Sequence, residues 1–187
     1  MRPAVKQARL DRYICIDFEA SALGAKSFPT EVGLADPVTG EVWATLIKPH
    51  PVWLTEGEWN AVGESVTGIT RPMLAESGAD PSQIYANVRR RVADRAVVSD
   101  SPSYDGRWFA ALAAAAMQGT GMEGEKPPPL LGLIMVAWEL AAARGRRPDI
   151  AWNKAELEVG LRFPKPHRAG PDARHNAEIL RHLAGAS

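Results

Sequence analysis

A short apolar stretch near the start of the sequence ends in two carboxylates, Asp17 and Glu19. Residues 12–18 predict a buried strand, and alternate side chains of a strand point to the same face of its sheet. Asp17 and Glu19 are therefore expected to lie side by side. Two like charges at this distance repel each other unless a cation lies between them, and carboxylate oxygens suit divalent ions such as Mg²⁺. The pair points to a catalytic metal site.

Three further residues of suitable chemistry stand at the ends of predicted elements. Asp105 heads a helix that follows a short strand, Asp172 lies in the first turn of the last helix, and His167 precedes that helix. Four carboxylates in one pocket could not all stay ionised, but a pair of Mg²⁺ or Mn²⁺ ions would offset their repulsion. Two ions about 3.5–4 Å apart are a common device for displacement at phosphorus. An imidazole titrates near neutrality, so His167 is suited to accept the proton of the attacking water.

Each of these patterns also has a structural explanation when it is taken alone. An Asp-x-Glu pair at a strand end is often surface charge, and an aspartate at the head of a helix is often an N-cap. A histidine five residues before such an aspartate can be incidental. The functional interpretation depends on all of them occurring together, in this order and on these elements.

Together the patterns resemble the three sequence motifs of the DEDDh 3′→5′ exonucleases, a family that includes proofreading exonucleases, ribonuclease T and oligoribonuclease. The matching segments are Asp17-x-Glu19, Ser103-Tyr104-Asp105 and His167-x-Ala169-x-x-Asp172-Ala173. Residues 30–34 resemble the second strand of the family, and residues 68–70 resemble part of its His-Gly-Ile-Thr segment. The resemblance covers residues 13–183 approximately, and it implies a ribonuclease H-like fold.

The resemblance also implies a role for each matching residue. His167 would be the general base. The ligands of two divalent ions, Mg²⁺ or Mn²⁺, would be Asp17, Glu19, Asp105 and Asp172. The substrate-binding residues around the terminal nucleotide would be Ala20, Ser21, Leu23 and Tyr104, with Leu23 as a hydrophobic wedge.

Two segments depart from the family pattern, and both face the substrate in the family. The second motif often begins with His-Asn, where this sequence has Ser99-Asp100-Ser101. The histidine of the His-Gly-Ile-Thr segment is replaced by Thr67. These departures concern the identity of the substrate more than the chemistry.

The elements that must position these residues follow a β-β-β-α-β-α-(β/α)-α-α order. Turn chemistry at residues 36–40 predicts a hairpin, so three antiparallel strands come first. Strands are expected at residues 12–18, 31–35, 41–48, 96–98 and 130–136. Helices are expected at residues 80–94, 105–118, 137–144 and 149–161, and from residue 170 onward. Residues 50–74 are expected to be long and irregular. This order predicts an α/β fold with a mixed sheet flanked by helices.

Composition restricts the class of protein further. The chain has 187 residues and 45% hydrophobic residues, which fits one globular domain over residues 1–187, with a core at about 12–184 and a flexible loop at 119–129. The single Cys15 is expected to be a small buried side chain, in keeping with a reducing cytoplasm. Residues 130–143 are apolar but too short to span a bilayer. We therefore expect a cytoplasmic protein with no membrane partner.

The formal net charge is zero, so any binding of nucleic acid must rest on metal–phosphate contacts and stacking. The resemblance implies an exonuclease that hydrolyses single-stranded RNA or DNA at its 3′ end and releases nucleoside 5′-monophosphates. It also implies a homodimer, because dimers are common among ribonuclease T-like members. Two alternatives remain: a catalytically weak nucleic-acid-binding module of the same fold, and a phosphodiesterase for small nucleotides.

Overall fold

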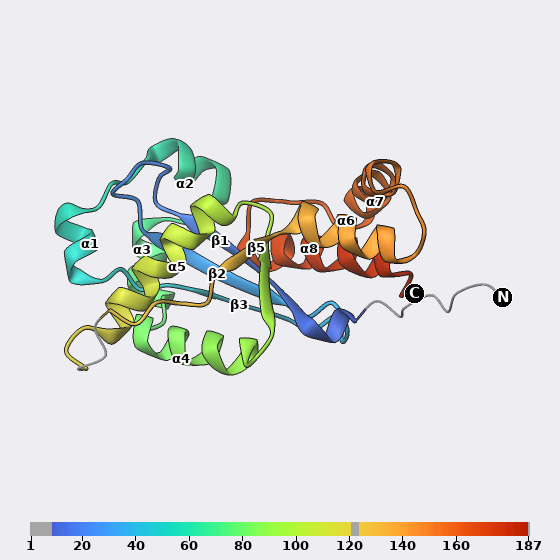
Figure 1. Ribbon diagram of the computed structural model, residues 1–187. Coiled ribbons are helices and arrows are strands. Elements are labelled where there is room, and N and C mark those ends of the chain that lie inside the picture. Colours follow the sequence, from blue (N-terminus) through green and yellow to red (C-terminus); the bar gives the residue numbers. More distant parts are fainter. Residues whose placement is uncertain (1–8, 121–123, 187) are drawn as a thin grey trace.

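A five-stranded mixed sheet lies at the centre of the computed structural model, which describes residues 9–120 and 124–186 (Figure 1). The strand order is β3-β2-β1-β4-β5. The first three strands pair antiparallel, whereas β1 with β4 and β4 with β5 pair parallel. The strands are β1 (Tyr13–Ala20), β2 (Pro29–Ala35), β3 (Val42–Leu46), β4 (Ala96–Ser99) and β5 (Leu130–Gly132). The predicted α/β fold, with three antiparallel strands followed by parallel ones, is confirmed.

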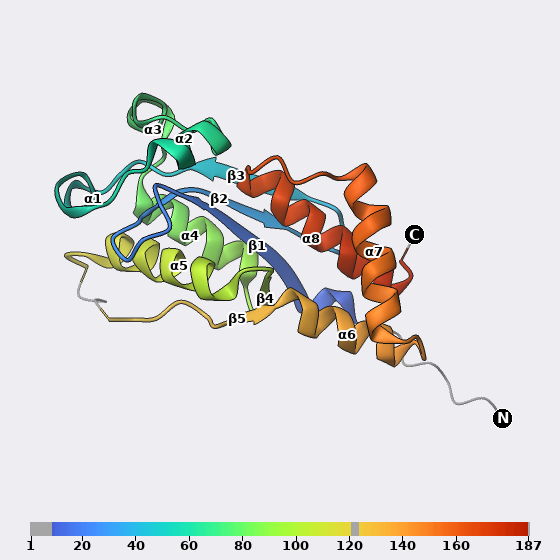
Figure 2. The ribbon, with the colours of Figure 1, turned by 90° about the horizontal axis from the view of Figure 1, so that it is seen from above.

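Helices cover both faces of the sheet (Figure 2). Helices α4 (Pro81–Val92) and α5 (Pro102–Met117) pack on one face, where Ile14, Ile16 and Phe18 of β1 belong to their apolar core. The opposite face packs against α6 (Leu133–Ala143) and α8 (Ala169–Ala184), and α7 (Pro148–Arg162) packs on those two helices. Cys15 lies in this second core and is fully buried, as expected. The alternation along β1 therefore sends even-numbered residues towards α4 and α5, and odd-numbered residues towards α8.

The region predicted to be irregular, residues 50–74, instead forms three short helices, so this prediction was wrong. They are α1 (Pro51–Glu56), α2 (Ala61–Thr67) and α3 (Arg71–Ser77). A side chain caps each of them at its start, from His50, Asn60 and Thr70 respectively, and a glycine follows each. Helices of six or seven residues are too short to show a clear helical period in the sequence. Backbone hydrogen bonds from Glu58 to Lys26 and from Asn60 to Ser21 tie this segment to the loop after β1.

The strand predicted at residues 130–136 ends at Gly132, and α6 begins at Leu133. Leu133, Val136 and Leu140 are buried at helical spacing. Ile134, Met135 and Trp138, which lie between them, are also apolar but are exposed, Met135 to 72%. An apolar residue at nearly every position hides the helical period, because buried strands and buried helices then look alike.

The start of α5 also differs from the prediction. The helix begins at Pro102, so Asp105 lies inside its first turn and not at its first position. Backbone hydrogen bonds from Tyr104 and Asp105 to the carbonyl of Ser101 close this turn. Proline at the first position has the φ that a helix requires, which lets α5 start directly after β4.

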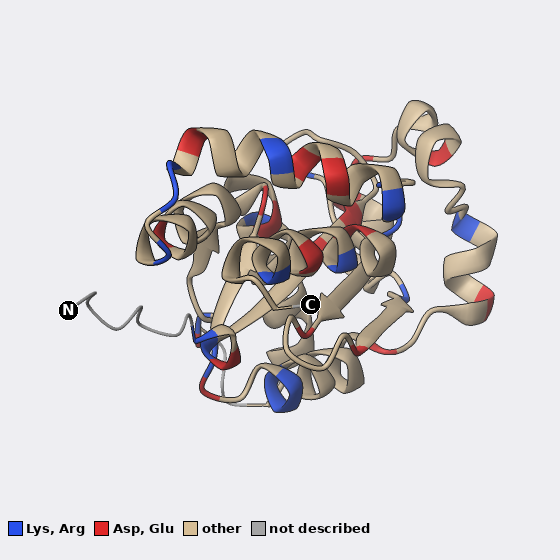
Figure 3. Ribbon diagram, turned by 90° about the vertical axis from the view of Figure 1, so that its right-hand side faces the viewer, with Lys and Arg blue, Asp and Glu red and all other residues tan. Residues whose placement is uncertain are grey.

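Other expectations concern the surface of the molecule. Of the loop predicted at residues 119–129, residues 121–123 lie outside the described part of the chain. None of the described helices is both long and apolar enough to cross a bilayer. Acidic and basic residues are interspersed over the helices seen in Figure 3, which agrees with the balanced charge of the sequence.

Candidate active site

Strand β1 presents Asp17 and Glu19 on the face that packs against α8. Asp17 lies opposite Gly33 of β2, and Glu19 lies opposite Glu31. The register of the β1–β2 ladder shifts between Glu19 and Ala20, so the regular pairing of β1 with β2 ends at Glu19. The alternation of the strand thus places both acidic groups on one face, at the carboxyl end of β1.

Helix α8 brings Asp172 to the same place because its first turn lies very close to β2. A side chain at Gly33 would overlap the backbone of Ala169, so only glycine allows this approach. One oxygen from each of Asp17, Glu19 and Asp172 lies within 4.8 Å of the others. The three carboxylates can therefore come together only because Gly33 of β2 has no side chain.

A buried carboxylate holds the start of α8 on the sheet. Glu31 accepts hydrogen bonds from Arg168 Nε at 2.9 Å, from Arg168 Nη2 at 2.6 Å and from the backbone N–H of Ala169 at 2.9 Å. The Glu31 side chain is 5% exposed, and charge-assisted bidentate pairs of this kind are both strong and directional. Glu31 and Arg168 thus fix the helix end that carries Asp172.

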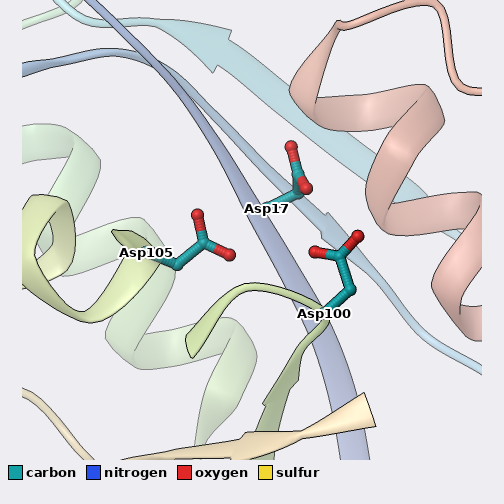
Figure 4. A group of neighbouring side chains, drawn as sticks. All are labelled: Asp17, Asp100 and Asp105. Atoms are coloured by element: carbon teal, nitrogen blue, oxygen red, sulfur yellow. The ribbon is translucent and has the colours of Figure 1, made fainter. Parts of the chain in front are cut away.

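A second group of carboxylates forms around the turn between β4 and α5. Oxygens of Asp17, Asp100 and Asp105 also lie within 4.8 Å of one another, and Figure 4 shows the three side chains gathered together. Asp105 is buried and accepts a hydrogen bond from the hydroxyl of Ser99, the last residue of β4. Asp17 therefore belongs to both groups.

Burial and mutual repulsion raise the pKa values of these carboxyls. Burial, together with the charges of four neighbouring carboxylates, raises the pKa of Asp17 well above its ordinary value. Burial and the charge of Asp172 raise the pKa of Glu19 to about 8, although Arg168 opposes the shift. Burial also raises the pKa of Asp105 to about 7, against the hydrogen bond from Ser99. Without a cation, the cluster would keep some of its protons at neutral pH.

The residues present suit divalent metal ions. Two groups of three carboxylates share one member, which is the donor set expected for hard cations with oxygen ligands. Asp172 is 5% exposed, yet its Oδ1 has no hydrogen-bond partner among the described residues. Buried polar atoms rarely lack a partner, so this oxygen is consistent with an ion as its partner. Asp17, Glu19 and Asp172 could hold one ion, and Asp17, Asp100 and Asp105 another.

His167 lies beside this cluster, in the loop before α8. Burial raises the pKa of Asp172, whereas the charges of Lys165 and His167 lower it, so the imidazole is within electrostatic reach of the carboxylate. His167 is exposed and belongs to neither carboxylate group. Its φ of 57° is uncommon for any residue except glycine. An exposed imidazole held in a strained backbone beside acidic groups fits a functional role.

The residues expected to bind the terminal nucleotide lie at the end of β1, in the loop after it and in α5. Ser21 is buried, and its hydroxyl oxygen accepts the N–H of Phe28, which closes the loop after β1. Leu23 in that loop and Tyr104 in α5 are exposed to 68% and 40%. Arg107 connects them, because it donates to the carbonyl of Leu23 at 3.2 Å and lies over the ring of Tyr104 at 4.9 Å. Ala20, at the end of β1, is half-buried.

Sequence reasoning missed Lys165 and left Asp100 as no more than a departure from the family pattern. Lys165 forms an ion pair with Asp100, and both line a groove of about 880 Å³ that also contacts Met135 and Trp152. Lys165 lies far from Asp100 in the sequence, so no local pattern could connect them. An acidic residue directly after a buried parallel strand was the available signal for Asp100, since functional groups gather at the carboxyl ends of such strands.

No protein-family model and no curated protein matches the sequence. Among solved structures, the chain is similar to E. coli exonuclease I in complex with a dT13 oligonucleotide, with 12% identity and a TM-score of 0.62 over 90% of this chain and 40% of that one. The zinc-bound E. coli exonuclease I–ssDNA complex gives 13% identity and a TM-score of 0.61, with the same coverage. S. pombe Pop2p, in a form with Mg²⁺ and Mn²⁺ bound, gives 15% identity and a TM-score of 0.58. That match covers 90% of this chain and 81% of the Pop2p chain.

The fold is that of exonuclease I and Pop2p. At identities of 12–15% these likenesses concern the fold, and this chain spans 40% of the length of the exonuclease I structures. The ribonuclease H-like fold implied by the sequence motifs is confirmed. The carboxylates gathered on that fold form a cluster suited to divalent metal ions.

Proposed function

We propose that this protein is a metal-dependent 3′→5′ exonuclease of the DEDDh type that acts on single-stranded nucleic acid. The observation that carries the proposal is the pair of carboxylate groups that share Asp17, with an imidazole beside them. Its support from known proteins is the shared fold with exonuclease I, which has been solved with single-stranded DNA, and with Pop2p, which has been solved with Mg²⁺ and Mn²⁺.

The proposed roles divide among the residues of the cluster. Asp17, Glu19, Asp105 and Asp172 would hold two divalent ions, which when bound supply activation of water and stabilisation of the leaving oxygen. An imidazole nitrogen of His167 would take the proton of the attacking water. Its exposure and its place in the loop before α8 would let it reach a water at the edge of the cluster.

The exposed side chains beside the cluster would bind the terminal nucleotide. Leu23 and Tyr104 offer an apolar side chain and an aromatic ring, which suit contact with a base and a sugar. Arg107 keeps the two in a fixed relation and adds a positive charge in a protein whose net charge is zero. Stacking of this kind is tolerant of sequence, so the proposal includes both RNA and DNA ends.

The test is hydrolysis of oligonucleotides labelled at the 5′ end, as single-stranded DNA, single-stranded RNA and duplex, with Mg²⁺ or Mn²⁺. We expect single strands to shorten stepwise from the 3′ end and to release nucleoside 5′-monophosphates, and we expect EDTA to stop the reaction. Cleavage of dinucleotides alone would indicate a small-nucleotide phosphodiesterase instead. Binding without cleavage, unchanged by Asp172→Asn, would contradict the enzyme proposal.

The proposed base has its own test. Replacement of His167 by Ala is expected to lower kcat by about 10²–10⁴-fold, because general-base catalysis contributes that much. Binding of Mn²⁺, measured by calorimetry, should be nearly unchanged, since His167 belongs to neither carboxylate group. His50→Ala, at the N-cap of α1, is the matched control and should keep wild-type kcat. Wild-type turnover in His167→Ala would remove His167 from this role.

A further inference from the structure

Asp100 is an acidic residue of the cluster that the family motifs do not include. It lies in the turn directly after β4, and one of its oxygens comes within 4.8 Å of oxygens from Asp17 and Asp105 (Figure 4). Its side chain is 31% exposed, so the carboxylate lies at the open edge of a cluster whose other two members are buried. Asp100 thus completes a set of three carboxylates from β1, the β4–α5 turn and α5.

Three carboxylates so close together need a cation, and the chain provides one. The ammonium group of Lys165 forms an ion pair with Oδ2 of Asp100. Lys165 therefore offsets the charge of the cluster at the place where Asp100 meets Asp17 and Asp105.

The loop that carries Lys165 favours this position. Lys165 stands between Pro164 and Pro166 in the segment that joins α7 to α8, and prolines restrict the backbone on both sides of it. The Lys165 side chain is 28% exposed, so part of it is solvated and it can leave Asp100 without disturbing the core. Partly exposed ion pairs contribute little to stability, which makes this one easy to exchange.

We propose that Asp100 is a ligand of the ion held by Asp17 and Asp105, and that Lys165 is a resident counter-ion which that ion displaces from Asp100. This inference rests on the proposed function only in requiring that the cluster binds divalent ions. It makes the two ions unequal. Among the described residues, no lysine forms an ion pair with Glu19 or Asp172, whereas the ion at Asp100 must compete with Lys165.

The test is calorimetric titration of the metal-free protein with Mn²⁺, with the fold of each variant checked by circular dichroism. We expect two binding events in the wild type. Asp100→Asn should weaken one of them by about 10-fold or more and leave the other unchanged, because one charged ligand is lost. Lys165→Met should tighten the same event by about 2- to 10-fold, because its competitor is gone.

The double variant separates competition from a general change of charge. In the Asp100→Asn background, Lys165→Met should have almost no further effect, because the two side chains act as a pair. Lys154→Met, on the exposed side of α7, is the matched control and should bind Mn²⁺ as the wild type does. A Lys165→Met effect that persists in the Asp100→Asn background would overturn the competition.

Two other results distinguish this inference from the proposed function. If the wild type binds Mn²⁺ at two sites and Asp100→Asn matches it, the inference fails while the metal centre stands. If the wild type binds no ion at all, the metal-dependent function fails together with the inference. The wild type could hydrolyse oligonucleotides while Asp100→Asn and Lys165→Met both bind Mn²⁺ as the wild type does. That result would support the proposed function and contradict the inference.

Discussion

The two carboxylate groups that share Asp17 are built in different ways. The group with Glu19 and Asp172 joins β1 to α8, and a buried glutamate and a glycine on β2 hold that helix in place. The group with Asp100 and Asp105 depends on the turn between β4 and α5. Its outer member is partly exposed and is neutralised by a lysine from a distant loop.

This difference indicates how one site can hold some of its carboxylates in a fixed geometry and let another exchange its bound cation. A carboxylate held between a strand and a helix keeps its geometry because the packing on both sides is dense. A carboxylate in a polar turn can exchange one cation for another at little cost in packing. We therefore expect substitutions to separate the two groups, except at Asp17, which both require.

The largest effect is expected at the shared residue. Asp17→Asn should remove both Mn²⁺-binding events and lower turnover by at least about 10³-fold, because bound metal supplies several kcal/mol of transition-state stabilisation. Calorimetry and single-turnover hydrolysis measure the two outcomes. Glu19→Gln, two residues away on the same strand, is the control and should remove only one event. Retention of either event in Asp17→Asn would break the comparison.

An intermediate effect is expected from Glu31, the buried clamp that holds the start of α8 on the sheet through Arg168 and Ala169. Glu31→Gln should weaken the binding of one ion by roughly 10- to 100-fold, the usual loss when a residue that supports metal ligands is changed. The event that depends on Asp100 should stay unchanged. Glu41→Gln, an exposed glutamate just before β3, is the matched control. The clamp would be unnecessary if Glu31→Gln bound both ions as the wild type does.

The smallest effect is expected in the stability of the metal-free protein. Burial raises the pKa of Glu19 from an ordinary value of 4.5 to about 8, and that of Asp105 from 3.8 to about 7. Between about pH 4 and pH 8 the unfolded chain therefore binds fewer protons than the folded one, and stability must fall as the pH rises. In EDTA, the midpoint of thermal unfolding should drop by roughly 5 °C from pH 5 to pH 8.

The same measurement can assign this loss to each carboxylate group. Glu19→Gln should remove the part of the decline that extends to about pH 8, and Asp105→Asn the part that ends near pH 7. Saturating Mg²⁺ should restore the midpoint at pH 8, because a ligand that binds the folded state stabilises it. A midpoint that is constant or rises from pH 5 to pH 8 without metal would contradict the raised pKa values.

Local patterns were enough to predict much of the fold. The alternation along β1 predicted that Asp17 and Glu19 share a face, and turn residues predicted the hairpin of β2 and β3. The stripe of small and apolar residues predicted α8, whose Ala173, Ala177 and Leu180 are all buried. These signals succeed because each one depends on neighbours in the sequence. They failed at α1–α3 and at α6, where the helices are too short or too uniformly apolar to show a period.

The candidate site also has features that local sequence patterns predict and features that they do not. Local patterns were enough to identify the acidic residues, their order and the elements that carry them. The meeting of Asp100 with Asp17 and Asp105, its ion pair with Lys165 and the contact of Glu31 with the start of α8 depend on packing between distant elements. Each of these contacts joins residues that lie far apart in the chain. Strand pairing and helix packing bring together residues that are tens of positions apart, and no local period records such a meeting.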